Sequence, residues 1–174
     1  MEMKNNVPDN WYESFFTGIN CEMWERAIPE EWTAKEVSFL IDVLEIGKGS
    51  DVLDIPLAAC LKPGARFIIN SGMIAESIIP KIPLEKTYVL GDLTMQINNE
   101  YVVSDSYMIS HLMYTKNGHS EQHSFKHYVY TIGELKRLLG SYGLKTIALY
   151  NGVEKGTYKF GDQQLFLVAE KFVS

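Results

Sequence analysis

Two short apolar runs in the middle of the chain predict buried strands. The first consists of Val52, Leu53 and Ile55 and follows the turn-forming residues 47–50; the second comprises residues 67–69 and follows Pro63 and Gly64. Continuous apolar runs are typical of parallel strands that are covered on both faces. A parallel pair requires a crossover of at least about a dozen residues, usually a helix. Only residues 56–66 lie between the two runs. The pattern therefore predicts an α/β fold in which the segment between the two strands is too short to form the crossover.

Apolar residues at helical spacing predict helices near the N-terminus. The first helix is expected to begin after the capping residue Asp9 or Asn10, to end near Gly18 or Asn20, and to present Trp11, Tyr12, Phe15, Phe16 and Ile19 on one side. The helical pattern continues over residues 21–27, until Pro29 breaks it.

A capping box predicts where a longer helix begins. Thr33 can accept hydrogen bonds from the free amides of the first turn, and Glu36 can reach back to the start of the helix. Trp32 precedes the box and is expected to pack against Val37. The predicted helix ends near Gly47 and buries a stripe made of Val37, Leu40, Ile41 and Leu44.

Residues 87–130 change to the alternating pattern of antiparallel strands. Residues 107–116 and 119–130 flank Asn117-Gly118, the strongest short sequence signal for a hairpin. A two-residue loop pairs Lys116 with His119, and a third strand is expected over residues 93–103. The predicted three-stranded meander then carries on one face Met108, Leu112, His123, Phe125 and His127.

The remaining chain returns to helix and strand patterns. Residues 131–134 form a second capping box, before a helix with the apolar stripe Leu135, Leu138, Leu139 and Tyr142. Strands are expected over residues 145–150 and 164–170, the latter at the edge of the sheet. Residues 57–61 are predicted to form the last turn of a helix, and residues 73–79 a short helix. Its single charged residue, Glu76, can cap a helix, face solvent or contact a substrate.

The composition narrows the possible partners and the location. The chain has 174 residues, of which 46% are hydrophobic and 22% charged, as in an ordinary globular domain. A formal net charge of −6 argues against nucleic acid as the main partner, because phosphate binding requires clustered Lys and Arg. Cys21 and Cys60 are expected to be free thiols. The polar first ten residues and the lack of a long apolar run predict a cytoplasmic protein that does not associate with a membrane.

Three histidines of the predicted hairpin raise the question of a metal site. His119, His123 and His127 are spaced four residues apart, which suits a helix, whereas this segment is predicted to be a strand. No cysteine or set of carboxylates completes a zinc site, so no metal is predicted. His123 or His127 is a candidate general base, because imidazole titrates near neutral pH. The competing interpretation is a solvated histidine on the face of a sheet.

Three segments resemble class I S-adenosylmethionine-dependent methyltransferases of the small-molecule type. VLDIP at 52–56 resembles the opening of their motif I, LKPGARFIIN at 61–70 resembles the entry to the fifth strand, and YTIGELKRLLGSYGL at 130–144 resembles the segment that leads into strand six. The family places a Gly-rich turn and strands two to four between the first two segments. A gap of about 60 to 90 residues is therefore expected. We predict that Pro56 and Leu57 are not consecutive in the native protein.

The resemblance implies a Rossmann-like α/β fold and a chemistry. It implies a single domain over 1–174, with an N-terminal helical lid (1–46), an α/β core (51–70 and 131–174) and an antiparallel substrate-covering insert after the fifth strand (87–130). The implied activity is transfer of a methyl group from S-adenosylmethionine to a nitrogen, oxygen or carbon atom of a small molecule. The implied cofactor-binding residues are Asp54, Trp11 and Tyr12. Asn70 and Ser71, at the end of a predicted strand, lie where α/β sheets bind ligands.

A second hypothesis is a non-catalytic protein. If Pro56 and Leu57 are consecutive, the Gly-rich turn is absent, and the recognition of the cofactor that it supports is absent too. The antiparallel sheet would then bind a small apolar ligand. The substrate contacts expected of a methyltransferase are Asn70, Glu76, Met108, Leu112 and Phe125. The contacts expected for an apolar ligand are Met95, Met108, Leu112 and Phe125. The sequence predicts neither the identity of a methyl acceptor nor an oligomeric state.

Overall fold

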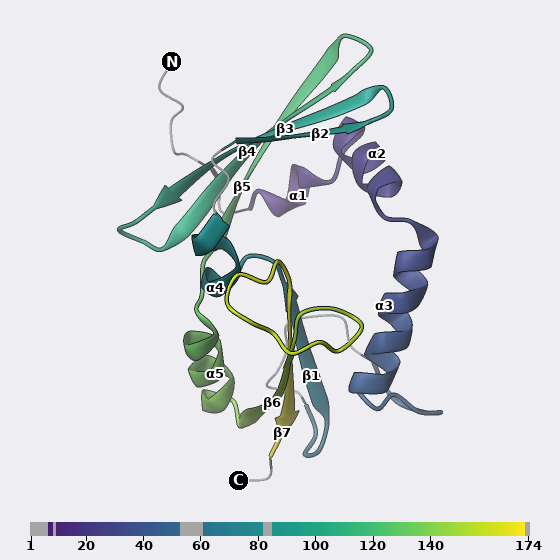
Figure 1. Cartoon of the computed structure of the whole chain (residues 1–174), viewed down its shortest axis with the longest axis vertical. Helices are drawn as coiled ribbons and strands as arrows, with labels where there is room; N and C mark the ends of the chain where they lie inside the picture. The colour runs from purple at the N-terminus through teal and green to yellow at the C-terminus, as the bar shows by residue number, and fades with distance from the viewer. Residues whose placement is uncertain (1–6, 9, 53–60, 82–84, 173–174) are drawn as a thin grey trace. The chain divides into compact units, whose positions relative to one another are not determined.

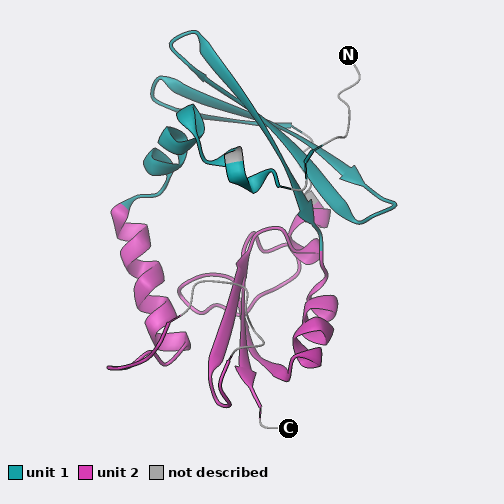
Figure 2. Ribbon diagram, turned by 180° about the vertical axis from the view of Figure 1, so that it is seen from behind, with its two compact units in different colours: residues 1–29, 82–129 teal, residues 30–81, 130–174 magenta. Residues whose placement is uncertain are grey.

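The computed structural model describes residues 7–8, 10–52, 61–81 and 85–172. The strand predicted at 52–55, the junction between Pro56 and Leu57, and the helical turn predicted at 57–61 therefore lie largely outside the described residues. The described chain divides into two compact units (Figure 2). Unit 1 comprises Met1–Pro29 and Ile82–Val129, and unit 2 comprises Glu30–Lys81 and Tyr130–Ser174.

Unit 1 is a four-stranded antiparallel sheet with two helices (Figure 1). The strands follow one another in sequence order: β2 (Glu85–Leu90), β3 (Leu93–Val102), β4 (Tyr107–Lys116) and β5 (His119–Tyr128). The predicted hairpin register is confirmed, since Lys116 pairs with His119, Leu112 with His123 and Met108 with His127. Asn117 and Gly118 both have positive φ, 50° and 78°, as a two-residue type I′ turn requires. The prediction missed β2.

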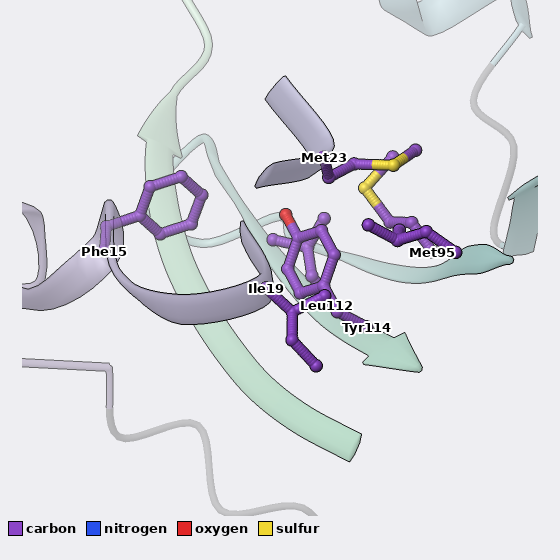
Figure 3. Packing of buried hydrophobic residues seen from close by; sticks show 7 residues of the cluster. Phe15, Ile19, Met23, Met95, Leu112 and Tyr114 are labelled. Carbon is purple, nitrogen blue, oxygen red and sulfur yellow. The ribbon is translucent and has the colours of Figure 1, made fainter. Parts of the chain in front are cut away.

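The core of unit 1 lies on the sheet face that its helices cover. α1 (Tyr12–Phe15) and α2 (Gly18–Ala27) place Phe15, Ile19 and Met23 against alternate residues of β3 and β4 (Figure 3). Their partners in the sheet are Leu93, Met95, Leu112 and Tyr114, all at most 6% exposed. The face that the alternation predicted as apolar is thus the face that is buried.

The first helix ends earlier than the end predicted near Gly18 or Asn20, and the second begins earlier than the predicted residue 21. α1 ends at Phe15, and α2 begins at Gly18, whose φ of +57° is unfavourable for other residues. The Ile19 amide, in the first turn of α2, donates a hydrogen bond to the Glu121 carboxylate of β5 at 2.7 Å. A Cβ atom at position 18 would overlap that carboxylate. A tertiary contact that helical spacing does not reveal therefore sets where α2 begins.

Unit 2 contains a three-stranded antiparallel sheet and its helices. Its strands are β1 (Arg66–Ser71), β6 (Leu144–Tyr150) and β7 (Leu165–Lys171), in the order β1-β7-β6. The prediction of β7 as an edge strand is wrong for the described sheet, because β7 pairs with both neighbours. The physical reason is burial: residues 165–169 are all buried, with their side chains divided between two apolar clusters on opposite faces. A strand with two apolar faces is stable in the middle of a sheet.

Two of the predicted helices of unit 2 are present, but their buried faces differ from the prediction. α3 (Glu30–Val43) begins three residues before the predicted capping residue Thr33. It buries Phe39 and Val43 against Phe166 and Val168, while Val37 and Ile41 are about half exposed, at 49% and 47%. The predicted stripe is confirmed for Leu40 and Leu44, which are partly buried against this cluster. It was wrong for Val37 and Ile41, and it left out Phe39, which packs edge-to-face on Phe166 with ring centroids 4.8 Å apart.

The capping box of α5 (Ile132–Ser141) is confirmed. The Thr131 hydroxyl accepts a hydrogen bond from the Glu134 amide, and the Glu134 carboxylate accepts one from the Thr131 amide. Leu135 and Leu139 are buried as expected, but Leu138 and Tyr142 are each 49% exposed. The short helix predicted at 73–79 appears as α4 (Ala75–Ile78), followed by the 3₁₀ turn η2 (Ile79–Lys81). Among the described helices none combines the length and the hydrophobicity needed to span a membrane.

Candidate functional site

The predicted site residues are distributed over both units. Trp11, Tyr12, Met108, Leu112, His123, Phe125 and His127 belong to unit 1, and Asn70 and Glu76 belong to unit 2. Asp54, the predicted cofactor residue at the end of the first strand, lies outside the described residues. Each unit therefore presents its own candidate surface.

In unit 1 an aromatic cluster joins α1 to β5. Trp11 lies at the start of α1 and contacts Phe15, Phe125 and His127, with ring centroids 5.4, 5.6 and 6.3 Å apart. The Phe125 and His127 rings are edge-to-face at 4.4 Å, because residues two apart on a strand point to the same face. The structure thus brings together one predicted cofactor residue, one predicted substrate residue and one candidate base.

Tyr12 differs from Trp11 in its exposure. Its ring lies edge-to-face on Trp11 with centroids 6.1 Å apart, but the residue is 60% exposed. An exposed aromatic face fixed on a packed neighbour can bind a planar or cationic group. The pair therefore has one anchored ring and one accessible ring.

The two candidate bases lie in different surroundings. Burial lowers the pKa of His127 below its ordinary value of 6.5, so its imidazole is neutral at pH 7. The His123 ring contacts Tyr114 and Phe15 at 5.7 and 5.9 Å, and its Nε2 lies 3.9 Å from a Glu121 carboxylate oxygen. A neutral imidazole can accept a proton, and it does so most efficiently when its pKa is near the working pH.

The remaining substrate candidates of unit 1 are part of its core. Met108 is 5% exposed and Leu112 is 3% exposed. Leu112 packs in the cluster that includes Phe15, Ile19 and Met23 (Figure 3). Phe125 is partly buried against the same cluster. Side chains of α1 and α2 therefore occupy the position at which Leu112 was predicted to contact a ligand.

The opposite face of the sheet carries a groove of about 350 Å³. One row of aligned residues crosses it: Glu85, Asn98, His111 and Ser124 pair in that order across the four strands. His111 Nδ1 and Ser124 Oγ are 2.8 Å apart. The groove is lined mainly by uncharged hydrogen-bonding groups, and the side chains predicted for the site project from the other face.

In unit 2 a polar chain of hydrogen bonds lies at the carboxyl end of β1. The Asn70 side chain donates to the Glu36 carboxylate of α3 at 2.9 Å and accepts from the Gln164 side chain at 2.8 Å. Gln164 immediately precedes β7. The predicted site residue Asn70 is thus held in a defined orientation by groups from two other elements.

Glu76 has a structural partner in this unit. Both of its carboxylate oxygens accept from the Ile132 amide, at 3.1 and 3.2 Å, at the start of α5. A carboxylate at this position also interacts favourably with the helix dipole. Of the three roles considered for Glu76, the structure shows helix capping.

Sequence reasoning missed two residues that organise these surfaces. Glu121 caps α2, and Tyr158 shares a 2.7 Å hydrogen bond with Ser77 of α4. Glu121 carries a weak signal, because a carboxylate on the apolar face of a strand needs a partner. Tyr158 lies in a Gly-containing loop without periodicity, where no sequence pattern singles it out.

Comparison with solved structures identifies the fold. The CcbJ methyltransferase from Streptomyces caelestis is 10% identical, with a TM-score of 0.56 over 65% of this chain and 46% of that one. An S-adenosylmethionine-dependent methyltransferase from Clostridium acetobutylicum ATCC 824 is 9% identical, with a TM-score of 0.58 over 67% of this chain and 48% of that one. No protein-family description and no curated protein matches the sequence.

The likeness confirms the expected fold class. The chain has the α/β, Rossmann-like fold of class I methyltransferases, over about two thirds of its length. It spans about half the length of each of these two methyltransferase structures. At such low identity the comparison concerns the fold, and the chemistry has to be argued from the residues.

Proposed function

We propose that the protein transfers a methyl group from S-adenosylmethionine to a nitrogen, oxygen or carbon atom of a small molecule. The observation that carries this proposal is the likeness in fold to an S-adenosylmethionine-dependent methyltransferase, at a TM-score of 0.58. The last strand, β7, is antiparallel to both of its neighbours. Because fold alone does not define activity, the proposal also depends on the residues of the site and on a direct assay.

The residues of unit 1 fit the aromatic and cationic parts of S-adenosylmethionine. Tyr12 offers an exposed ring, which lies edge-to-face on the Trp11 ring. Adenine stacks on such rings, and a sulfonium is attracted to their faces. We therefore assign Trp11 and Tyr12 to the cofactor, together with Asp54 of the motif I segment. When bound, the cofactor supplies an electrophilic methyl group.

The contribution expected of the chain itself is to orient the acceptor and to take up its proton. Methyltransferases of this type act largely by holding the reactants close and in line. A neutral His127 is able to accept the proton that an amine or hydroxyl acceptor loses, and His123 is the second candidate. In unit 2, Asn70 is assigned to the acceptor, because its amide lies at the carboxyl end of a strand.

The proposal extends to the organisation of the chain. Residues 87–130 are assigned as an antiparallel, substrate-covering insert after the fifth strand, and residues 1–46 as the lid of one methyltransferase domain. We also propose that a segment is missing between Pro56 and Leu57. The chain's coverage of only about half of each matched methyltransferase supports this. A cytoplasmic location, and the absence of nucleic acid and membrane partners, remain part of the proposal.

The non-catalytic alternative is less well supported. It requires an apolar ligand site formed by Met95, Met108, Leu112 and Phe125. Met95 and Leu112 are at most 6% exposed and pack against side chains of α1 and α2. A ligand there would have to displace part of the core of unit 1.

A methyl-transfer assay tests the proposal. Intact protein of verified mass is incubated with S-adenosylmethionine labelled in its methyl group and a panel of small amines, amino sugars, phenols and carboxylic acids. Label in one class of product, lost on heat denaturation of the protein, is the expected result. Absence of transfer to every class, by full-length native protein of verified mass, contradicts the proposal.

A further inference from the structure

The connection between β6 and β7 is long and ordered. Residues 151–164 form neither a helix nor a strand, and Thr157 of this loop forms an isolated bridge with Tyr150 of β6. Within the loop the Asn151 amide donates to the Gly156 carbonyl at 2.9 Å, and the Lys159 amide donates to the Asp162 carboxylate at 2.7 Å. Loops of this length without helix or strand are uncommon in compact domains and are usually functional when they are ordered.

The loop lies at the same sheet edge as the predicted acceptor residue. β1 and β6 are both antiparallel to β7, so they run in the same direction and their carboxyl ends share one edge of the sheet. Asn70 is at the end of β1, and Gln164 at the end of the loop donates a hydrogen bond to it at 2.8 Å. Ligands of α/β sheets bind beyond this kind of edge.

Two hydrogen bonds from α4 hold the loop there. Ser77 Oγ and Tyr158 Oη are 2.7 Å apart, and the Gly161 amide donates to the Glu76 carbonyl at 2.9 Å. Ser77 is only 6% exposed, so its bond to Tyr158 is shielded from competing water. Burial raises the pKa of Tyr158 above its ordinary value of 10.0; the hydrogen bond with Ser77 opposes this rise, and the Glu76 and Asp162 carboxylates add to it. The phenol therefore keeps its proton at neutral pH.

We propose that Tyr158 is a positioning residue of the acceptor site: its bond to Ser77 fixes the β6–β7 loop beside Asn70 and thereby sets the affinity for the acceptor. The inference rests on the proposed methyl transfer. The side chains at this edge include the amides of Asn70 and Gln164 and the carboxylate of Glu36. They favour a polar acceptor that forms several hydrogen bonds over an apolar one.

Hydrogen exchange of the full chain tests the first half of the proposal. Tyr158→Phe removes only the phenol oxygen and Ser77→Ala only its partner, so both keep the apolar packing. Tyr142→Phe, at an exposed tyrosine that ends α5, is the matched control. Exchange in peptides covering 156–163 is expected to be about 3- to 10-fold faster in the first two variants and unchanged in the control. Equal exchange in all three variants overturns the proposal.

Kinetics with the compound that accepts label in the panel described above test the second half. Both variants are expected to raise KM for this acceptor about 3- to 10-fold, with kcat and the affinity for S-adenosylmethionine within about twofold of the unmodified protein. Faster loop exchange with an unchanged KM overturns the role in positioning. If no compound accepts a methyl group, the proposed function fails and the acceptor role fails with it, while the exchange data alone decide whether the bond holds the loop.

Discussion

The Glu121 carboxylate of β5 accepts a hydrogen bond from the Ile19 amide of α2 at 2.7 Å, across 102 residues of sequence. The residue at the N-cap of α2, Thr17, makes no side-chain capping bond. Glu121 therefore provides the cap that the local sequence lacks, and its charge is favourable at a helix N-terminus. The contact fixes α2, and with it Ile19 and Met23, on the sheet of unit 1.

Glu121→Ala is expected to destabilise the protein by about 1–2 kcal/mol, because it removes the only side-chain cap described at the start of α2. Urea unfolding followed by circular dichroism measures the change. Gln122→Ala is the matched control, since Gln122 is exposed and projects from the other face of β5. Equal unfolding free energies for the two variants would show that the contact does not support α2.

Two glycine substitutions should have opposite effects. Gly18→Ala is expected to destabilise by at least about 1 kcal/mol, because Gly18 has a φ of +57° and an added Cβ would meet the Glu121 carboxylate. Gly140→Ala, in α5 where nothing lies near the added Cβ, is expected to stabilise by about 0.5–1 kcal/mol. Thermal unfolding measures both changes. A Gly18→Ala protein as stable as the original would contradict the described start of α2.

The stability of the protein should depend on pH through His127. Because burial lowers its pKa in the folded state, the unfolded chain binds more protons in the pH range below the ordinary value of 6.5. The contribution to stability is therefore fully present above pH 6.5 and is lost as the pH falls through the lowered pKa. Urea midpoints measured from pH 8 to pH 5 should fall more for the unmodified protein than for His127→Gln. Identical pH profiles would mean that His127 is not buried as described.

The start of α5 provides two caps that can be compared. Thr131→Ala removes the side chain that accepts from Glu134, and Glu76→Ala removes the carboxylate that accepts from Ile132. Each is expected to lower the unfolding free energy by about 1 kcal/mol. Glu154→Ala, at an exposed residue of the β6–β7 loop, is the control. If only Thr131→Ala lowers the unfolding free energy, the hydrogen bond from the Ile132 amide to Glu76 does not contribute to stability.

The parts of the fold that depend on neighbouring residues could be predicted from the sequence. Asn117-Gly118 specifies a two-residue turn, and the turn sets the pairing of β4 with β5 residue by residue. The capping box of α5 is equally local, because Thr131 and Glu134 are three residues apart. The cluster of Phe125 and His127 on one face followed from the same register.

The parts that depend on distant residues could not be predicted. The break between α1 and α2 is set by Glu121 on β5, and the central position of β7 by its pairing with both β1 and β6. Apolar spacing along α3 favoured Val37 and Ile41, whereas the aromatic contact of Phe39 with Phe166 decides which face is buried. Among the candidate site residues, spacing placed Trp11 on a helix but did not indicate its contacts with β5.

The most direct test of the account is calorimetric titration of the intact protein, its mass verified, with S-adenosylmethionine. We expect saturable binding with a micromolar Kd. Tyr12→Ala is expected to weaken the binding at least about 10-fold, because it removes the exposed tyrosine ring that contacts the adenine or the sulfonium of the cofactor. Trp32→Ala serves as the control, since this tryptophan is also 60% exposed but lies on α3. No binding by protein of verified mass would contradict the assignment as a methyltransferase.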